Sequence, residues 1–394
     1  MRVWAMTKIF PNAARPLTAP FFRQQFVELA KLCELRVAGL IPWFPGASLT
    51  GNRTGAGEQS GVPARETIDG LEVFHPRVFH PPKVGVPLLG AAYTASLLPL
   101  ALKLRGEVDV IFGTWAYPDG FAAVALGEIL GIPAVVQVIG SDIHQLTKRP
   151  GVRWNLRWAL PRCSRVVSVS RQLGETCVEL GLPAERLEVV VTGVDRELFC
   201  LVDRAQARAA VGADPKERLI VSVGRLEAEK GAFDLLDAFE RIAPRDASLR
   251  LVMLGDGSRE DEVRERAATL GGRVSVLGSR PLDEVARWVQ ASDLVTLPSW
   301  AEGTPNALME AFSCGRRVVS TRVGGIPDMV TSEVLGELVD ARDVEALAEA
   351  LWRVVSTPYD AEAVTHAYPL ITWPQNAARI HDVLKAAVDE RQGG

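Results

Sequence analysis

A short segment suited to binding an anion follows the apolar run Leu294–Leu297. Thr304 is a favourable N-cap residue and Pro305 suits the first helical position, so we predict a helix that begins at Pro305 and stops near Gly315. The free backbone N–H groups at such a helix start form a ready anion site. Gly303, just before it, has no side chain, so a ligand can approach the backbone closely.

Two carboxylates flank this predicted anion site. Glu302 lies just before the helix and Glu310 lies inside it. Carboxylate oxygens accept hydrogen bonds, so the pair is suited to sugar hydroxyls on either side of a bound phosphate. A capped core helix with two solvated glutamates has the same spacing, and spacing alone does not decide between the two interpretations.

A second segment places two cations after a predicted strand. The apolar run 219–223 leads into a loop that contains Arg225 and Lys230. Open α/β sheets bind ligands at the carboxyl ends of their strands, and guanidinium and ammonium groups both suit phosphate oxygens. Two surface cations that pair with Glu227 and Glu229 are the alternative.

The elements that must position these residues alternate along the chain between short apolar runs and amphipathic stretches. Many of the runs are apolar throughout, as in parallel strands covered on both faces. The alternation predicts an α/β protein of two doubly wound domains. We expect an N-terminal domain over 1–199 and a C-terminal domain over 200–374, with a final helix near 375–394 returning to the first domain.

The composition of the 394 residues is ordinary for a globular chain, with 47% hydrophobic and 23% charged residues. The net charge of −4 argues against a nucleic-acid binder. No strand leads into G-x-G-x-x-G, no Gly-Lys dipeptide occurs, and no two aspartates form D-x-D. These absences argue against a dehydrogenase or P-loop protein and against a carboxylate clamp for a metal-bound diphosphate.

The cysteines and histidines do not predict a metal site. The cysteines form no C-x-x-C pair and the histidines are scattered, so we expect free thiols in a reducing cytosol, with neither disulfides nor zinc. The five cysteines are Cys33, Cys163, Cys177, Cys200 and Cys314.

Taken together, the two segments resemble glycosyltransferase family 4. These are retaining nucleotide-sugar transferases of the GT-B fold, in which two Rossmann-like domains face each other across a cleft. That family's phosphate-binding pair resembles Gly224-Arg225-x4-Lys230-Gly231, and its E-x7-E motif resembles Glu302-x7-Glu310. Other similar segments, in the same order along the chain, are 192–195, 292–294 and 324–328.

The N-terminal half resembles the branch of that family that builds exopolysaccharides, teichuronic-type polymers and similar surface glycans. The similar segments are 10–12, 115–120 and 139–143. One position departs from the pattern, because Ala19 stands where this branch usually has glycine beside the donor phosphate. The added methyl group is expected to restrict that loop.

The resemblance implies a role for each matching residue on the donor side. Arg225 and Lys230 would hold the diphosphate and stabilise the charge of the leaving group. Glu310 would accept hydrogen bonds from the ribose hydroxyls, and Glu302 would contact the donor sugar. The backbone that would touch the phosphate and the sugar is that of Gly303, Thr304, Pro305 and Asn306.

Two further roles are implied outside these loops. Arg280 would lie beside the nucleotide base. Asp142 would reach the donor sugar from the other domain, although a strand-end aspartate in an Asx-turn fits the same position.

The function that the resemblance implies is retaining transfer of a sugar from a UDP- or GDP-sugar to a glycan or lipid-linked acceptor in surface polysaccharide biosynthesis. No cofactor and no metal are expected, since two cations can balance the diphosphate. Two alternatives remain. One is a GT-B relative with other chemistry, such as a nucleotide-sugar epimerase or a phosphorylase, and the other is a non-catalytic GT-B binding partner.

The charge is unevenly distributed, with +4 over residues 1–200 and −8 over 201–394. A basic stretch over 148–171 contains Trp154 and Trp158, and no acidic residue lies between Asp142 and Glu175. The apolar run 86–102 is shorter than a spanning helix needs, so we expect it to be buried or to dock on a surface.

These features predict a cytoplasmic protein that lies peripherally on the inner face of a membrane, with the basic stretch on anionic lipid. A solvated basic helix whose tryptophans pack inward is the alternative.

Overall fold

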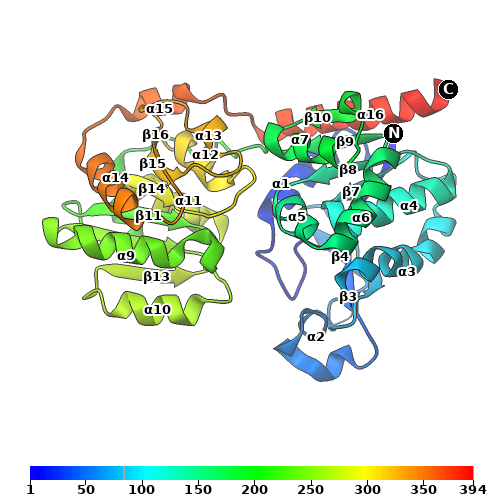
Figure 1. The fold of residues 1–394 in the computed structure, drawn as a ribbon, viewed down its shortest axis with the longest axis horizontal. Helices are drawn as coiled ribbons and strands as arrows, with labels where there is room; N and C mark the ends of the chain where they lie inside the picture. The colour runs from blue at the N-terminus through cyan, green and yellow to red at the C-terminus, as the bar shows by residue number, and fades with distance from the viewer. Residues whose placement is uncertain (83–84, 394) are drawn as a thin grey trace. The chain divides into compact units, whose positions relative to one another are not determined.

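The computed structural model describes residues 1–82 and 85–393, which form two compact α/β units (Figure 1). Unit 1 comprises Met1–Gly193 and the C-terminal segment from Trp373, and unit 2 comprises Val194–Thr372. The first boundary lies before Phe199 rather than after it, because Phe199 is buried in the core of unit 2. Each unit has a largely parallel sheet with helices on both faces, which confirms the predicted fold class.

The sheet of unit 1 has eight strands in the order β10-β9-β8-β7-β1-β2-β5-β4, and only β4 runs antiparallel to its neighbour. The order reverses between β1 and β7, and ligands of doubly wound sheets bind beside such a reversal. A separate two-stranded sheet pairs β3 (Ile41–Trp43) with β6 (Arg77–Phe79). The strands of the large sheet are β1 (Arg2–Thr7), β2 (Glu34–Gly39), β4 (Arg65–Ile68), β5 (Leu71–Phe74), β7 (Val110–Thr114), β8 (Ala134–Val138), β9 (Arg165–Ser168) and β10 (Leu187–Val189).

Helices cover both faces of this sheet. On one face, Phe22 and Phe26 of α1 (Pro20–Leu29) and Ile380 and Leu384 of α16 (Trp373–Gly393) share a core, because residues four apart lie on one side of a helix. The other face carries α3 (Leu89–Lys103), α4 (Phe121–Leu130) and α6 (Pro150–Ala159). Shorter helices are α2 (Gly55–Glu58), α5 (Ser141–His144) and α7 (Arg171–Glu179).

Unit 2 has a six-stranded sheet in the order β13-β12-β11-β14-β15-β16, and all its neighbours are parallel. Its order reverses between β11 and β14. The strands are β11 (Arg218–Val223), β12 (Leu249–Leu254), β13 (Val274–Gly278), β14 (Leu294–Leu297), β15 (Arg317–Thr321) and β16 (Gly336–Val339). The helices are α8 (Arg204–Val211), α9 (Ala232–Ile242), α10 (Glu260–Ala268), α11 (Leu282–Ala291), α12 (Asn306–Ser313), α13 (Ile326–Met329), α14 (Val344–Ser356) and α15 (Ala361–Ala367).

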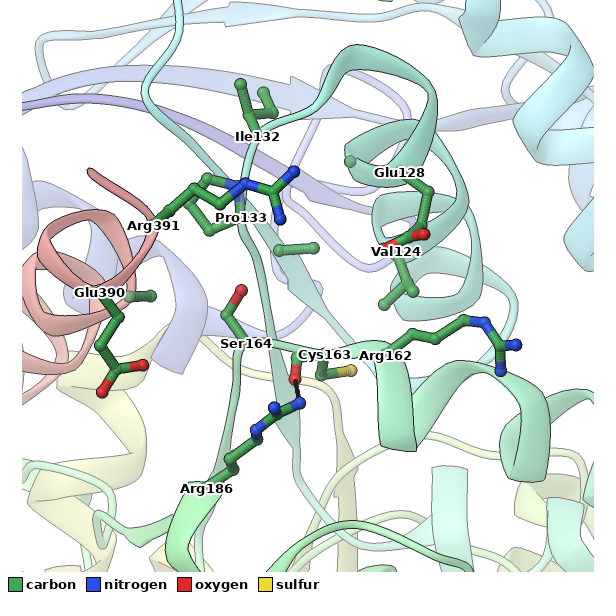
Figure 2. Close-up of a pocket in the computed structure, with 13 residues that line it drawn as sticks. Val124, Glu128, Ile132, Pro133, Arg162, Cys163, Ser164, Arg186, Glu390 and Arg391 are labelled. Carbon is green, nitrogen blue, oxygen red and sulfur yellow. Dashed lines mark hydrogen bonds between the residues drawn. The ribbon is translucent and has the colours of Figure 1, made fainter. Parts of the chain in front are cut away.

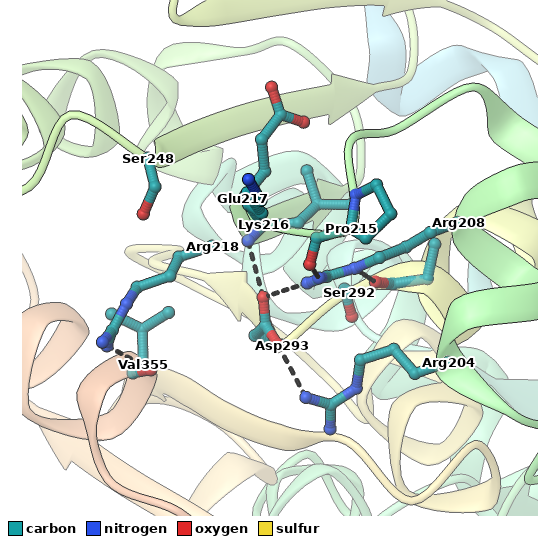
Figure 3. Close-up of polar contacts among 12 residues, drawn as sticks. Arg204, Arg208, Pro215, Lys216, Glu217, Arg218, Ser248, Ser292, Asp293 and Val355 are labelled. Carbon is teal, nitrogen blue, oxygen red and sulfur yellow. Dashed lines mark hydrogen bonds and ion pairs between the residues drawn. The ribbon is translucent and has the colours of Figure 1, made fainter.

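Asp293 ties the amino ends of the two central strands of unit 2 to α8 (Figure 3). Its carboxylate lies 2.7 Å from Arg204 Nη1 and 2.6 Å from Arg208 Nη2, and it accepts a hydrogen bond of 2.7 Å from Leu219 N. The Arg208 guanidinium is buried and also donates to the carbonyl oxygen of Pro215. Asp293 is thus a structural residue, and it lies at the sheet edge opposite to the ends of β11 and β14 that carry the predicted site.

Ala19, the residue that departs from the family pattern, has a left-handed backbone with φ 42° and ψ 59° and lies at the N-cap position of α1. A residue with a Cβ atom is strained there by about 1–2 kcal/mol. The structure therefore gives a physical reason for a glycine at this position, and the chain keeps the strain instead.

We expect Ala19→Gly to raise the free energy of unfolding of unit 1 by about 0.5–1 kcal/mol, because the relief of strain exceeds the added entropy of the unfolded chain. Urea unfolding followed by a signal from unit 1 measures the shift in midpoint. Ala91, exposed within α3, is the matched control, and Ala91→Gly should lower stability by about 1 kcal/mol. A loss at position 19 of the size seen at position 91 would show that the left-handed backbone carries no strain.

Candidate active site

The loops that follow β11 and β14 meet at the carboxyl edge of the unit 2 sheet, because these two strands are neighbours. Trp300 N donates to Glu229 O across the two loops at 2.8 Å. Gly231 has φ +70°, and a Cβ atom there would lie 2.0 Å from Pro298 O. Only glycine permits this approach, so the backbone itself fixes the first loop against the second.

Lys230 and Glu302 form an ion pair between these loops. Lys230 Nζ lies 2.6 Å from Glu302 Oε1, and the same oxygen accepts a hydrogen bond of 2.7 Å from Ser299 Oγ. The Lys230 and Glu302 side chains are 26% and 11% exposed, so the pair is shielded from most of the solvent but remains open to a ligand. The structure thus brings together two predicted site residues, one from each segment.

Arg225 lies in the same loop as Lys230 but is 68% exposed, and its Nη2 is 2.7 Å from Glu227 Oε1. Glu227 also accepts hydrogen bonds from Ser258 N at 3.0 Å and Ser258 Oγ at 2.5 Å. Burial alone would raise the pKa of Glu227, but the Ser258 bonds and the Arg225 charge together lower it. The alternative of surface pairing therefore holds for Arg225, whereas Lys230 pairs with Glu302 and not with Glu229.

Helix α12 begins at Asn306, one residue later than predicted, so the predicted start at Pro305 and the N-cap at Thr304 are both wrong. Pro305 occupies the cap position with an extended backbone, φ −73° and ψ 119°, and the helix has no side-chain cap. The pyrrolidine ring also disfavours helical geometry at the preceding residue, Thr304. The predicted stop is confirmed, since Gly315 is left-handed with φ +68° and its N–H donates to Phe312 O at 2.9 Å.

The remaining loop residue, Gly303, is buried, and its carbonyl oxygen accepts a hydrogen bond of 2.8 Å from Gly325 N. This bond holds the backbone that leads into α12 against the start of α13. The N–H groups at the start of α12 are thus presented by a fixed loop.

Glu310 lies in α12 with a half-buried side chain. Within the described part of the chain, no side chain or backbone group hydrogen-bonds or ion-pairs its carboxyl group. Burial raises the pKa of Glu310 to about 7. A buried carboxyl without a partner is costly unless a ligand supplies hydrogen-bond donors.

Arg280 is not brought together with these residues. It follows β13, the edge strand two places from β11, and its Nε lies 3.1 Å from Glu284 Oε1. The residue is partly exposed at the same edge of the sheet, and its predicted place beside a nucleotide base stays a prediction.

Asp142 of unit 1 is fully buried, and both of its oxygens bind the backbone. Oδ2 accepts from Ala116 N at 2.8 Å, and Oδ1 accepts from Gly140 N at 2.8 Å and Ile139 N at 3.2 Å. Burial raises the pKa of Asp142, although these bonds act in the opposite direction. All three donors precede Asp142 in the chain, whereas an Asx-turn accepts from a residue two positions later, so the Asx-turn alternative does not describe these bonds. Asp142 holds together the loops after β7 and β8, and its predicted contact with a donor sugar stays a prediction.

Sequence reasoning did not single out Asp119, which lies beside the strand-order reversal of unit 1. Asp119 is fully buried, and its Oδ2 accepts a hydrogen bond of 2.7 Å from Lys8 N, at the end of β1. Its Oδ1 has no partner among the described residues, and burial raises its pKa to about 7. Lys8 Nζ lies 5.1 Å from the ring centroid of Trp115. Lys8 directly follows β1, and Trp115 and Asp119 follow the neighbouring strand β7. This position at the carboxyl ends of two strands is the feature of the sequence that could have pointed to them.

Two pockets lie elsewhere, in unit 1. One of about 320 Å³ is found at the amino ends of β8 and β9, where Arg162, Arg186 and Arg391 line it with Glu128 and Glu390 (Figure 2). Another, of about 400 Å³, lies beside β2 and β5. Neither contains a predicted site residue, and open α/β sheets bind ligands at the carboxyl edge. Over residues 1–82 and 85–393, no three His, Cys, Asp or Glu side chains are grouped so as to hold a metal ion.

Comparison with known proteins gives two matching family models. A model described as glycosyl transferases group 1 matches residues 217–357, and one described as glycosyltransferase family 4 matches residues 56–198. The teichuronic acid biosynthesis glycosyltransferase TuaC of Bacillus subtilis is 28% identical over 365 residues, which cover 90% of this chain and 89% of that protein. A D-inositol 3-phosphate glycosyltransferase of Rhodococcus opacus is 35% identical over 216 residues, but the match spans only about half of each chain, 51% of this one and 48% of that one.

Solved structures agree in fold over both units. HepE of Anabaena, in complex with UDP and glucose, has a TM-score of 0.66 and 21% identity, with 100% of this chain and 98% of that chain covered. Sucrose-phosphate synthase of Thermosynechococcus elongatus has a TM-score of 0.69 and 17% identity, with the same coverage. With two α/β units, matching models in both and the Lys230–Glu302 arrangement at one carboxyl edge, the chain belongs to the family 4 glycosyltransferases of the GT-B fold.

Proposed function

We propose that this glycosyltransferase moves a sugar, with retention, from a UDP- or GDP-sugar to a glycan or lipid-linked acceptor in surface polysaccharide biosynthesis. The observation that carries the proposal is the Lys230–Glu302 pair beside the start of α12, at the strand-order reversal of unit 2. HepE, similar in fold, binds UDP and glucose, and TuaC, similar over nearly its whole length, is named for teichuronic acid biosynthesis.

The chemistry proposed for this edge is electrostatic. A departing diphosphate gains negative charge, and Lys230, Arg225 and the N–H groups of α12 would donate to it. Diphosphate oxygens would replace Glu302 as the partner of Lys230, and this leaves Glu302 free to accept hydrogen bonds from the donor sugar. In a same-face attack the leaving phosphate oxygen takes the proton of the acceptor hydroxyl, so no protein nucleophile is needed.

The acceptor is assigned to unit 1. Lys8, Trp115 and the unpartnered oxygen of Asp119 lie at the carboxyl ends of β1 and β7, the place where a doubly wound sheet binds its ligand. We assign the protein to the cytoplasm, peripherally on the inner face of the membrane, where a lipid-linked acceptor would be presented.

A panel of UDP-, GDP- and ADP-sugars tests the donor directly. We expect slow hydrolysis of a single donor, measured as the release of free sugar. That donor would identify both the base and the sugar. Hydrolysis of none of these donors, with no nucleotide binding by calorimetry, would contradict the proposal.

Lys230→Ala should lower the rate of donor hydrolysis by about 10²–10³-fold, the effect of removing one electrostatic contact to the transition state. Arg225→Ala should act in the same direction. Lys216→Ala, at an exposed position at the other edge of the sheet, is the control and should leave the rate unchanged. If Lys230→Ala and Arg225→Ala both hydrolyse the donor at the rate of the unmodified protein, these two residues do not bind the diphosphate.

Activity should persist in EDTA, because two cations rather than a metal ion balance the diphosphate in this proposal. The measurement is donor hydrolysis before and after chelation, and again with added Mg²⁺ or Mn²⁺. Loss of activity that either ion restores would show that a metal bridges the diphosphate.

The affinity for the nucleotide-sugar should depend on pH through Glu310, because its diphosphate diester, unlike the terminal phosphate of a free nucleoside diphosphate, does not titrate near neutral pH. The ionised carboxylate accepts both ribose hydroxyls, so binding lowers its pKa from about 7, and below that pH the free protein must first release a proton. The dissociation constant is therefore expected to rise by up to about tenfold per pH unit as the pH falls below 7, and to level off above it.

Titration calorimetry between about pH 5 and 8 measures this dependence. Glu310→Gln keeps a hydrogen-bond acceptor without the charge, and its affinity should not change with pH over this range. A pH dependence that survives in Glu310→Gln would assign the proton to another group.

A further inference from the structure

The outward side of α3 is apolar. No charged residue occurs over the described residues between 85 and 102. Leu97 and Ala101 face the core of unit 1, whereas Leu88, in the turn before α3, is 62% exposed and Leu102 is 50% exposed. A helix on a protein surface normally turns charged residues to the solvent, whereas an apolar side is normally buried against another surface. The outward side of α3 is apolar but remains exposed. Between the two leucines the exposed residues are Ala91, Ala95 and Pro99.

By length and composition this helix is long and apolar enough to span a membrane over Val86–Lys103, so the expectation that the run is too short for that is wrong. Its inner side, however, is part of a folded core. Tyr93 is 1% exposed and its hydroxyl lies 2.8 Å from His80 Nδ1, and Leu97 is fully buried. The helix therefore lies along unit 1 and offers only its outer side to a partner.

Helix α6 begins next to the start of α3. Asn155 Nδ2 donates to Pro87 O at 2.6 Å, and a Cβ atom on Gly151 would lie 2.6 Å from Pro87 Cγ. Since α3 and α6 both pack against α4, the three helices lie side by side on one face of the unit 1 sheet (Figure 1). We call the exposed surface of α3 and α6 the α3–α6 face.

The α6 part of this face is cationic and carries an exposed aromatic ring. Trp154, next to Asn155, is 69% exposed, whereas Trp158 packs against Phe121 with ring centroids 5.0 Å apart and ring planes tilted by 41°. Inward packing of the tryptophans thus holds for Trp158 only. The exposed cations, none of which pairs with a carboxylate of the described residues, are Lys148, Arg149, Arg153 and Arg157.

We propose that the α3–α6 face docks on an anionic lipid bilayer. An apolar strip fits the acyl boundary, an exposed tryptophan fits the headgroup level, and unpaired arginines fit anionic headgroups. The four cations without carboxylate partners favour an anionic surface over the uncharged core of a protein interface. The proposal deepens the proposed function, because it identifies the part of unit 1 that would bring the enzyme to a lipid-linked acceptor.

Co-sedimentation of the full chain with phosphatidylcholine vesicles, with and without phosphatidylglycerol, tests the proposal. We expect binding to the anionic vesicles that weakens as salt rises, and weak binding to the neutral ones. Arg153→Ala with Arg157→Ala should lower partition into anionic vesicles by about 25-fold, since each basic residue contributes about fivefold. Arg196→Ala, at an exposed position of unit 2, is the control for charge and should have no effect.

The apolar strip is tested separately by Leu88→Glu with Leu102→Glu, which should abolish binding even at low salt. Leu32→Glu is the control, because Leu32 is 46% exposed and follows α1, on the opposite face of the sheet. All of these variants should hydrolyse the sugar donor in solution at the unmodified rate, so loss of docking is distinguishable from failure of the proposed function.

Three outcomes would overturn the proposal. The first is no binding to anionic vesicles, and the second is binding that both site variants retain. The third is self-association of the chain in solution that Leu88→Glu with Leu102→Glu disrupts while vesicles have no effect, which would make the α3–α6 face an interface between copies.

Discussion

The ion pair between Lys230 and Glu302 is the interaction on which the candidate active site depends. It joins the loops of two strands that are far apart in sequence and adjacent only because the sheet order reverses between them. The close approach of Gly231 to Pro298 O fixes the backbone of one loop against that of the other. Because one charge cannot be left alone in a partly buried place without a large penalty, Lys230 and Glu302 hold each other in place at this edge of the sheet.

This arrangement has a cost and a benefit. In the proposed function, a diphosphate would have to compete with Glu302 for Lys230 and with Glu227 for Arg225, so part of the attraction would be offset before a donor binds. The benefit would be that Lys230 and Glu302 are already held at one place before a donor binds, and such preorganisation favours electrostatic stabilisation of a transition state. Glu310 differs from the other carboxylates, since no cation in the described part of the chain pairs with it and its partial burial raises its pKa.

Patterns of residue type predicted the fold and the meeting of the two segments, because buried parallel strands and a glycine beside a cation leave strong signals in sequence. Features that depend on single dihedral angles or single oxygens were not predictable. The start of α12 differs by one residue because Pro305 is extended. Asp142 accepts hydrogen bonds from three backbone N–H groups, and the spacing of residues along the chain does not predict this. The unpartnered oxygen of Asp119 can be recognised only when β1 and β7 are known to be neighbours.

The ion pairs of the structure help to interpret the uneven charge along the chain. In the second half many charges are already neutralised in pairs, as at Asp293 with Arg204 and Arg208, and the net balance there is negative. On α6 the arginines have no such partners. In the proposed docking, an anionic leaflet would attract residues 1–200 and repel the acidic second half, so charge would favour one orientation within a Debye length of the surface. The apolar side of α3 would then supply the contact that salt does not screen.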